Sequence, residues 1–178
     1  MPPVGKRQRI ILTALFTSLA VVLGYLMAAV PNIELITLTV FLSGMFVGSY
    51  CGAVTGALSI TIFSLFNPYG APLPPLLAAQ IIGLALAGAA GGAMRGMIAR
   101  KGMMIAAISG LTVTMIYDIL TTLASAYITL GPEAFVDGLA GFFAASAVFI
   151  LVHTGVNTVI FSQAAAAVTR LSYFDDEI

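Results

Sequence analysis

The sequence predicts an all-α integral membrane protein, a compact six-transmembrane-helix bundle that forms a single transmembrane domain over residues 1–178. Two observations on composition predict this class. Of the 178 residues, 60% are hydrophobic and 8% are charged, against about 25% charged residues in soluble domains. The mean hydropathy is +1.09. A third observation, the one-sided distribution of the cations, predicts that the N- and C-termini are both cytoplasmic.

Charges and helix-breaking residues divide the chain into apolar segments, and a bilayer-spanning helix needs about 20 mostly apolar residues. The predicted spans cover residues 10–30, 33–50, 52–66, 76–94, 103–129 and 139–168, two of which are short. A cleaved signal peptide is the alternative for residues 6–30. It is disfavoured because its apolar region exceeds the usual length of about 7–15 residues and further spans follow.

The cations flank only one end of the predicted spans. They are Lys6, Arg7 and Arg9 before the first span, Arg95, Arg100 and Lys101 between the fourth and fifth, and Arg170 after the sixth. With the N-terminus inside, all seven cations are cytoplasmic, as the positive-inside rule requires. The predicted outer loops, residues 31–34, 67–75 and 129–137, contain acidic side chains and no cation.

Small residues recur at four-residue spacing in three of the spans. They are Gly44, Gly48, Gly52 and Gly56 around the inner turn between spans two and three, and Gly83, Ala87 and Gly91 with Gly88, Gly92 and Gly96 in span four. Such stripes let helix backbones approach closely in lipid. We therefore expect them to pack the bundle rather than to bind a ligand.

Two outer loops are candidates for the mouth of a site. Residues 67–75 contain four prolines and a glycine, which predicts a stiff, irregular connection that serves as a lid or wall. Asn67 and Tyr69 either contact a ligand there or belong to a plain connector with an interfacial tyrosine. Pro31 ends the first span, so that Asn32 and Glu34 lie at the outer mouth, where we expect Glu34 to be solvated.

Polar residues inside the apolar segments are the strongest functional signal. At helical spacing, Asp118 and Thr122 share a face, as do Tyr117 with Thr121 and His153 with Asn157. A carboxylate at the centre of a bilayer costs about 2.5–3.5 kcal/mol, and each polar group needs an internal partner or a watery cavity. These residues predict a polar pocket. The candidate substrate-binding residues are Asn32, Asn67, Tyr69, Gln80, Tyr117, Asp118, Thr121, Thr122, His153 and Asn157.

Two structural alternatives remain open for the ionisable pair. Asp118 could pin two helices together, and His153 could be a packing histidine. A contact between the two side chains is possible, because both fall in the outer half or near the middle of their predicted spans.

Enzymatic signatures are missing from the sequence. It has no phosphate-binding loop, no dinucleotide-binding glycine motif, no zinc-protease motif and no nucleophile elbow. One histidine and one cysteine cannot build a multi-histidine or multi-cysteine metal site. We therefore expect no enzyme activity, no catalytic residue, no metal and no cofactor, and we expect no nucleic acid among the partners.

The segments 13–20, 31–59, 67–83, 115–124 and 153–161 together resemble the substrate-binding S components of energy-coupling factor (ECF) transporters. The resemblance implies a multi-pass protein of a prokaryotic plasma membrane that binds a vitamin or related micronutrient from outside. It also implies partners, a transmembrane T component and two cytoplasmic ATPase subunits. The family's AxxxA docking motif on the first span is matched by Ala14 and Ser18, with serine in place of the second alanine.

Two other functions compete with this expectation. One is a small proton- or cation-coupled secondary transporter in which Asp118 is the relay, although residues 1–90 and 91–178 show no convincing repeat. The other is a membrane scaffold that binds no ligand. The sequence does not identify the vitamin, but the absence of outer cations disfavours strongly anionic cargo.

Overall fold

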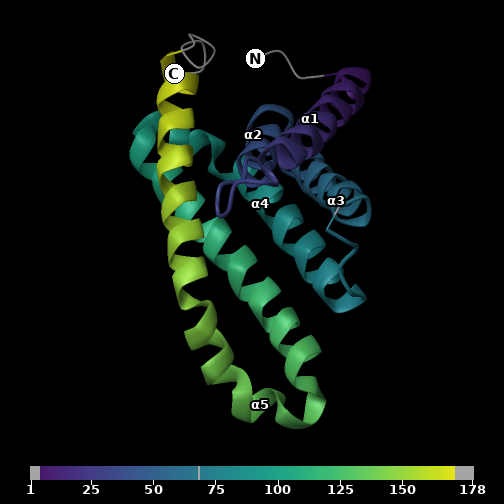
Figure 1. The fold of residues 1–178 in the computed structure, drawn as a ribbon. Coiled ribbons are helices and arrows are strands. Elements are labelled where there is room, and N and C mark those ends of the chain that lie inside the picture. Colours follow the sequence, from purple (N-terminus) through teal and green to yellow (C-terminus); the bar gives the residue numbers. More distant parts are fainter. Residues whose placement is uncertain (1–4, 68, 171–178) are drawn as a thin grey trace.

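The structure is a computed structural model that describes residues 5–67 and 69–170. Within these residues all regular secondary structure is helical, and no strand is present (Figure 1). The helices are α1 (Lys6–Met27), α2 (Ile36–Val47), α3 (Ser49–Leu65), α4 (Pro74–Lys101) and α5 (Met103–Arg170).

The described residues form five helical elements in place of the predicted six, and the difference lies entirely in α5. The predicted fifth and sixth spans both belong to α5, which is interrupted only at Gly131, with φ 73° and ψ 167°. Glycine accepts this positive φ at little cost, and Pro132 restarts the helix without needing an N–H partner. The predicted loop over 129–137 is therefore also wrong, and Glu133 and Asp137 lie within α5. The chain reverses direction near Gly131, so that α5 is a helical hairpin (Figure 1).

Three helices, α1, α4 and α5, are long and apolar enough to cross a membrane. The protein is therefore membrane-embedded, as the composition predicts. Helices α2 and α3 contain 12 and 17 residues, fewer than the about 20 that a full span requires. They are apolar but short, in agreement with the two short predicted segments.

Glycine and proline set the remaining helix boundaries. Gly48, with φ 112°, separates α2 from α3 in a conformation that other residues rarely adopt. Pro74 and Pro75 open α4, where a missing N–H costs nothing, so the irregular outer loop is shorter than predicted. Helix α4 ends before Gly102, and its last turn contains Arg100 and Lys101, which favourably oppose the negative end of the helix dipole.

The predicted close packing of small residues is confirmed among α2, α3 and α4. A Cβ atom added at Gly44 or Gly52 would overlap the carbonyl oxygen of Gly88, and one added at Gly91 would overlap that of Phe41. These helices therefore touch backbone to backbone, as small-residue stripes allow. Gly48 and Gly96 lie outside this contact, because a Cβ added at either residue would meet nothing within 4 Å.

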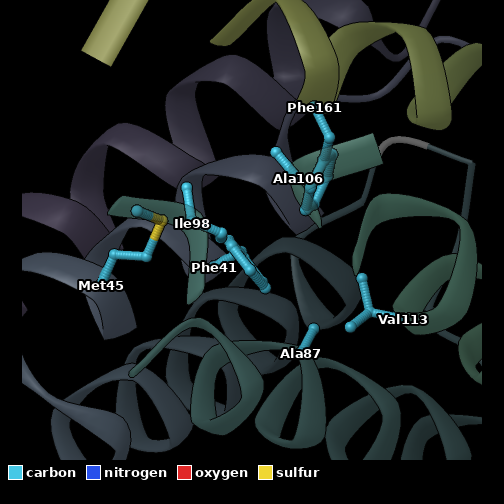
Figure 2. Close-up of a cluster of buried hydrophobic side chains, with 7 residues drawn as sticks. All are labelled: Phe41, Met45, Ala87, Ile98, Ala106, Val113 and Phe161. Atoms are coloured by element: carbon cyan, nitrogen blue, oxygen red, sulfur yellow. The ribbon is translucent and has the colours of Figure 1, made fainter. Parts of the chain in front are cut away.

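A hydrophobic cluster joins α2, α4 and both halves of α5 (Figure 2). Its centre is an edge-to-face pair, Phe41 of α2 and Phe161 of α5, with ring centroids 5.1 Å apart. Both side chains are buried. Phe161 lies one helical turn after Asn157, so this contact holds the polar part of the second α5 half beside the start of α2.

The start of α1, the end of α4 and the end of α5 lie toward one end of the molecule, opposite the break in α5 (Figure 1). Lys6 is the first residue of α1, and Lys101 is the last residue of α4. This is the arrangement that a common cytoplasmic side for the cations requires. The side of the membrane on which the termini lie stays a prediction.

Candidate functional site

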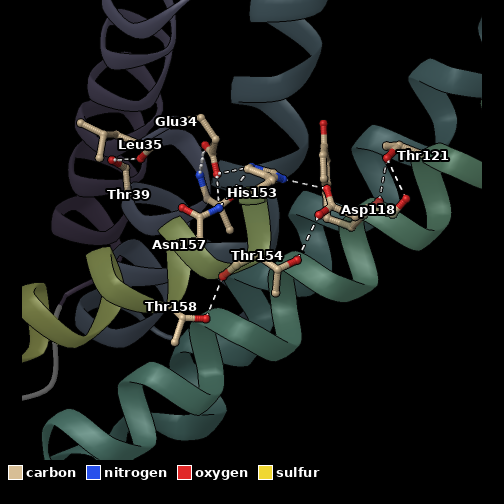
Figure 3. A network of polar contacts seen from close by, with 11 residues as sticks. Glu34, Leu35, Thr39, Asp118, Thr121, His153, Thr154, Asn157 and Thr158 are labelled. Atoms are coloured by element: carbon tan, nitrogen blue, oxygen red, sulfur yellow. Dashed lines mark hydrogen bonds and ion pairs between the residues drawn. The ribbon is translucent and has the colours of Figure 1, made fainter. Parts of the chain in front are cut away.

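A buried hydrogen bond between Asp118 and His153 forms the centre of the polar cluster (Figure 3). Asp118 lies in the first half of α5 and His153 in the second, and His153 Nδ1 is 2.8 Å from Asp118 Oδ1. The other carboxylate oxygen accepts a hydrogen bond from Thr154 Oγ1 at 3.3 Å. The residue Asp118 is 1% exposed. Burial at this depth requires such partners, because lipid provides none.

Glu34 and Asn157 extend the cluster to the segment between α1 and α2. Asn157 Nδ2 donates to Glu34 Oε1 at 3.1 Å and lies 3.2 Å from His153 Nε2. The amide nitrogen can only donate, so we assign Nε2 as an acceptor and place the ring proton on Nδ1, where it is donated to Asp118. Glu34 Oε1 also lies 3.8 Å from Nε2. A protonated ring would thus face a carboxylate on each side.

Glu34 corrects the expectation of a solvated side chain. Its side chain is 25% exposed, and Oε2 accepts a hydrogen bond from the backbone N–H of Thr37 at 2.9 Å. A carboxylate at this place satisfies a free N–H of the first α2 turn and favours the positive end of the helix dipole. Burial raises the pKa of Glu34, but a protonated His153 and the hydrogen bonds with Thr37 lower it by more, so that the pKa lies below its ordinary value.

A cavity of about 300 Å³ opens beside this cluster. The connection between α1 and α2 lines one side through Pro31, Asn32 and Glu34, while α3 contributes Phe63. Helices α4 and α5 contribute Gln80, Leu84, Tyr117, Phe149 and His153, and the end of α1 and the start of α2 complete the wall. The volume lies at the lower end of the range for small-molecule sites, and the mixture of aromatic rings with a few polar groups is typical of them.

Two buried amide oxygens near the cavity have no hydrogen-bond partner, Asn32 Oδ1 and Asn157 Oδ1. Asn32 lines the cavity and has a positive φ of 60°, a conformation that asparagine tolerates better than most residues. Buried polar atoms normally have partners. The unpaired Asn32 oxygen therefore indicates a place for a donor from water or a ligand.

Gln80 and Tyr117 connect the cavity to a second hollow between α4 and the two halves of α5. This hollow has a volume of about 510 Å³ and is also lined by Asp118, Thr121 and Thr122. Gln80 Oε1 accepts a hydrogen bond from Ser64 of α3. Thr121 donates to the backbone of its own helix, to the carbonyl oxygens of Tyr117 and Asp118. Seven of the ten predicted site residues thus line one of the two hollows, and Asn157 lies directly behind them.

The structure does not bring Asn67 and Tyr69 to the site. Asn67 Oδ1 accepts a hydrogen bond from the backbone N–H of Tyr69 at 2.9 Å, which is a local turn contact. Tyr69 is 77% exposed, and neither residue lines the cavity. The loop over 67–75 is therefore not the wall that its prolines predict. Residues 28–34 line the cavity instead.

Ala14 and Ser18 lie on an exposed face of α1, next to a groove of about 630 Å³ between α1 and α3. Tyr50 and Cys51 form the other side of this groove. The groove shares no lining residue with the cavity. A small-residue face that is open to the surroundings permits close approach by another helix.

Glu34, Thr154 and Phe149 were not among the predicted site residues. A signal for Glu34 was present in the sequence, since a carboxylate three residues before Thr37 is placed to cap the helix that starts there. No comparable signal exists for Phe149, an apolar side chain in an apolar segment, whose ring lies 5.5 Å from that of His153.

The described residues contain no group of three or more His, Cys, Asp or Glu side chains arranged to hold a metal ion. Compared with family models, with curated proteins and with solved structures, the chain matches none of them.

Proposed function

We propose that this chain is the high-affinity substrate-binding membrane subunit of an ECF-type importer for a vitamin or related micronutrient. The observation that carries the proposal is the cavity beneath residues 28–34, in which Glu34, His153 and Tyr117 surround a volume suited to a small molecule. The site has hydrogen-bonding groups and aromatic rings, which fix the orientation of a ligand. Binding requires no covalent chemistry, so the subunit is not an enzyme and uses no cofactor.

The ligand enters from the outer side and displaces water from the cavity. Asn32 Oδ1 has no partner within the protein and accepts a hydrogen bond from the ligand. Gln80 and Glu34 form hydrogen bonds with the polar edges of the ligand ring, while Tyr117 and Phe149 pack against its flat face. Residues 28–34 form the movable lid, because they line the cavity and lie between α1 and α2.

Energy for transport comes from partners. The open face around Ala14 and Ser18 docks on a transmembrane T component, and two cytoplasmic ATPases drive the release of cargo inside the cell. This docking face is separate from the cavity, so that the subunit can bind ligand and partner together. The protein is then a multi-pass subunit of a prokaryotic plasma membrane with cytoplasmic termini.

One specific observation favours a second candidate, a proton-coupled transporter. His153 lies between two carboxylates, 2.8 Å from Asp118 Oδ1 and 3.8 Å from Glu34 Oε1. A carboxylate–imidazole–carboxylate chain within a membrane can relay protons. In that case transport depends on the proton gradient and needs no ATPase.

Uptake assays separate these functions. The chain is expressed alone and together with a T component and both ATPases, in cells that lack other vitamin importers. The proposal predicts uptake of one vitamin only with the full set, and loss of uptake when the ATPases carry inactivating substitutions. Uptake by the chain alone that collapses with the proton gradient supports the second candidate. No uptake and no binding in any combination supports a scaffold.

A further inference from the structure

The charge balance of the cavity wall is strongly one-sided. Glu34 lines the cavity, and Asp118 lies directly behind His153. With a neutral imidazole the three groups sum to a charge of −2, and with an imidazolium to −1. No Lys or Arg is among the described residues that line either hollow. The site is thus negative in both protonation states of the histidine.

Protein groups neutralise this charge only in part. Glu34 accepts neutral donors, the Asn157 amide and the Thr37 backbone N–H. Asp118 accepts from His153 and Thr154. Buried charges that lack a full counter-charge are costly. A positively charged group that enters the cavity removes this cost, whereas an anion adds to it.

The rest of the lining suits a planar cation. Phe63, Tyr117 and Phe149 contribute aromatic rings to the same cavity, and the faces of such rings attract cations. Asn32 Oδ1 presents an unpaired buried acceptor that accepts an N–H or O–H. The wall, as the described residues form it, therefore offers hydrogen-bond acceptors but no Lys or Arg side chain, and the aromatic rings provide flat surfaces beside these acceptors.

We propose that the cavity selects a planar, positively charged ligand with hydrogen-bond donors, a heteroaromatic cation or a ring with a protonated amine. Glu34 provides the counter-charge, and Asp118 orients His153 behind it. This inference rests on the proposed function, because it defines the class of vitamin that the importer subunit captures. A volume of about 300 Å³ restricts the ligand to one or two small rings.

The first test is retention of probes by the full chain in lipid nanodiscs. The protein is incubated at neutral pH with an equimolar mixture of thiamine and pyridoxamine as cations, riboflavin as a neutral compound, and biotin and pantothenate as anions. After washing, the retained compound is identified by mass spectrometry. The inference predicts that a cation is retained. Retention of riboflavin, biotin or pantothenate alone overturns the inference but leaves the importer function intact. Retention of none counts against both.

The second test is a matched pair of isosteric variants. Glu34→Gln removes the counter-charge, and Glu133→Gln makes the same change at an exposed position of α5. The inference predicts that Glu34→Gln raises the Kd of the retained cation about tenfold or more, as expected for a lost charge pair. Glu133→Gln leaves this Kd unchanged. An unchanged Kd in Glu34→Gln, with thermal unfolding like that of the parent, overturns the inference.

Discussion

His153 Nδ1 lies 2.8 Å from Asp118 Oδ1, although the two residues are 35 positions apart in the sequence. The contact joins the two halves of the α5 hairpin at the edge of the cavity. It therefore combines two tasks, holding the hairpin closed and orienting the imidazole toward Glu34. The first task affects stability and the second affects ligand binding, so variants can separate them.

Asp118→Asn removes the carboxylate while keeping the shape of the side chain. The variant weakens the hydrogen bond that orients His153 toward the cavity, and a hydrogen bond to a charged group contributes about 1.5–3 kcal/mol. We therefore expect the Kd for ligand to rise about tenfold or more. Binding is measured in nanodiscs by isothermal titration calorimetry. Asp137→Asn, an exposed position of the same helix, is the control. Equal losses of thermal stability with and without ligand, with an unchanged Kd, would identify a helix pin instead.

The backbone contact among α2, α3 and α4 predicts a steric effect at Gly88. An added Cβ atom would overlap the carbonyl oxygen of Gly52, which can move only if the helices separate. We expect Gly88→Ala to lower the free energy of unfolding by about 1–3 kcal/mol or more, the usual cost of overpacking. Gly96→Ala in the same helix meets open space and serves as the control. Equal unfolding midpoints in a detergent denaturation series would contradict the packing.

The helices and their class were predictable from the sequence, because they depend on local composition. Apolar segments, the glycine stripes and the prolines at the start of α4 act over a few residues. The break in α5 was less predictable. Residues 129–137 contain Gly131, Pro132 and acidic side chains that indicate a loop, yet a single glycine with positive φ reverses the chain and the helix resumes at once.

The site was predictable only in part. Tyr117, Asp118 and His153 were candidates because each is polar within an apolar segment. Helical spacing paired residues only within one segment, so the contact between Asp118 and His153 stayed open. Glu34 was not assigned to the site, because its contact with Asn157 spans 123 positions and no local pattern reports such a distance. Asn67 and Tyr69 were assigned to it on loop composition alone, and composition does not tell which outer loop folds over a cavity.

The open face of α1 predicts a separation of docking from binding. Ser18→Leu places a bulky side chain on the small-residue face, which blocks close helix approach. We expect this variant to lose co-purification with the T component and ATPases while the Kd for ligand stays unchanged. Ala144→Leu, at an exposed position of α5, is the control. Normal complex formation by Ser18→Leu would remove this face from the docking surface.

Acid should weaken the site through Glu34. Its pKa in the folded protein is lowered from the ordinary value, so the ionised form stabilises the fold above that ordinary pKa, and this contribution is lost as the pH falls through the lower, folded-state pKa. The comparison is made with Glu34→Gln, which leaves His153 and Asp118 in place. We expect the parent to lose more thermal stability than the variant as the pH is lowered from about 5 to below the ordinary glutamate pKa of about 4.3. Parallel curves would show that Glu34 contributes no such linkage.

The central claim, that the cavity captures a vitamin-like molecule, is tested most directly by the content of the purified protein. The chain is isolated from cells grown with a mixed vitamin pool, and bound small molecules are identified by mass spectrometry. The account predicts one vitamin in near-equimolar amount in the parent protein, and much less in Asp118→Asn. Repeated preparations with an empty cavity, together with no thermal shift from any vitamin, would contradict it.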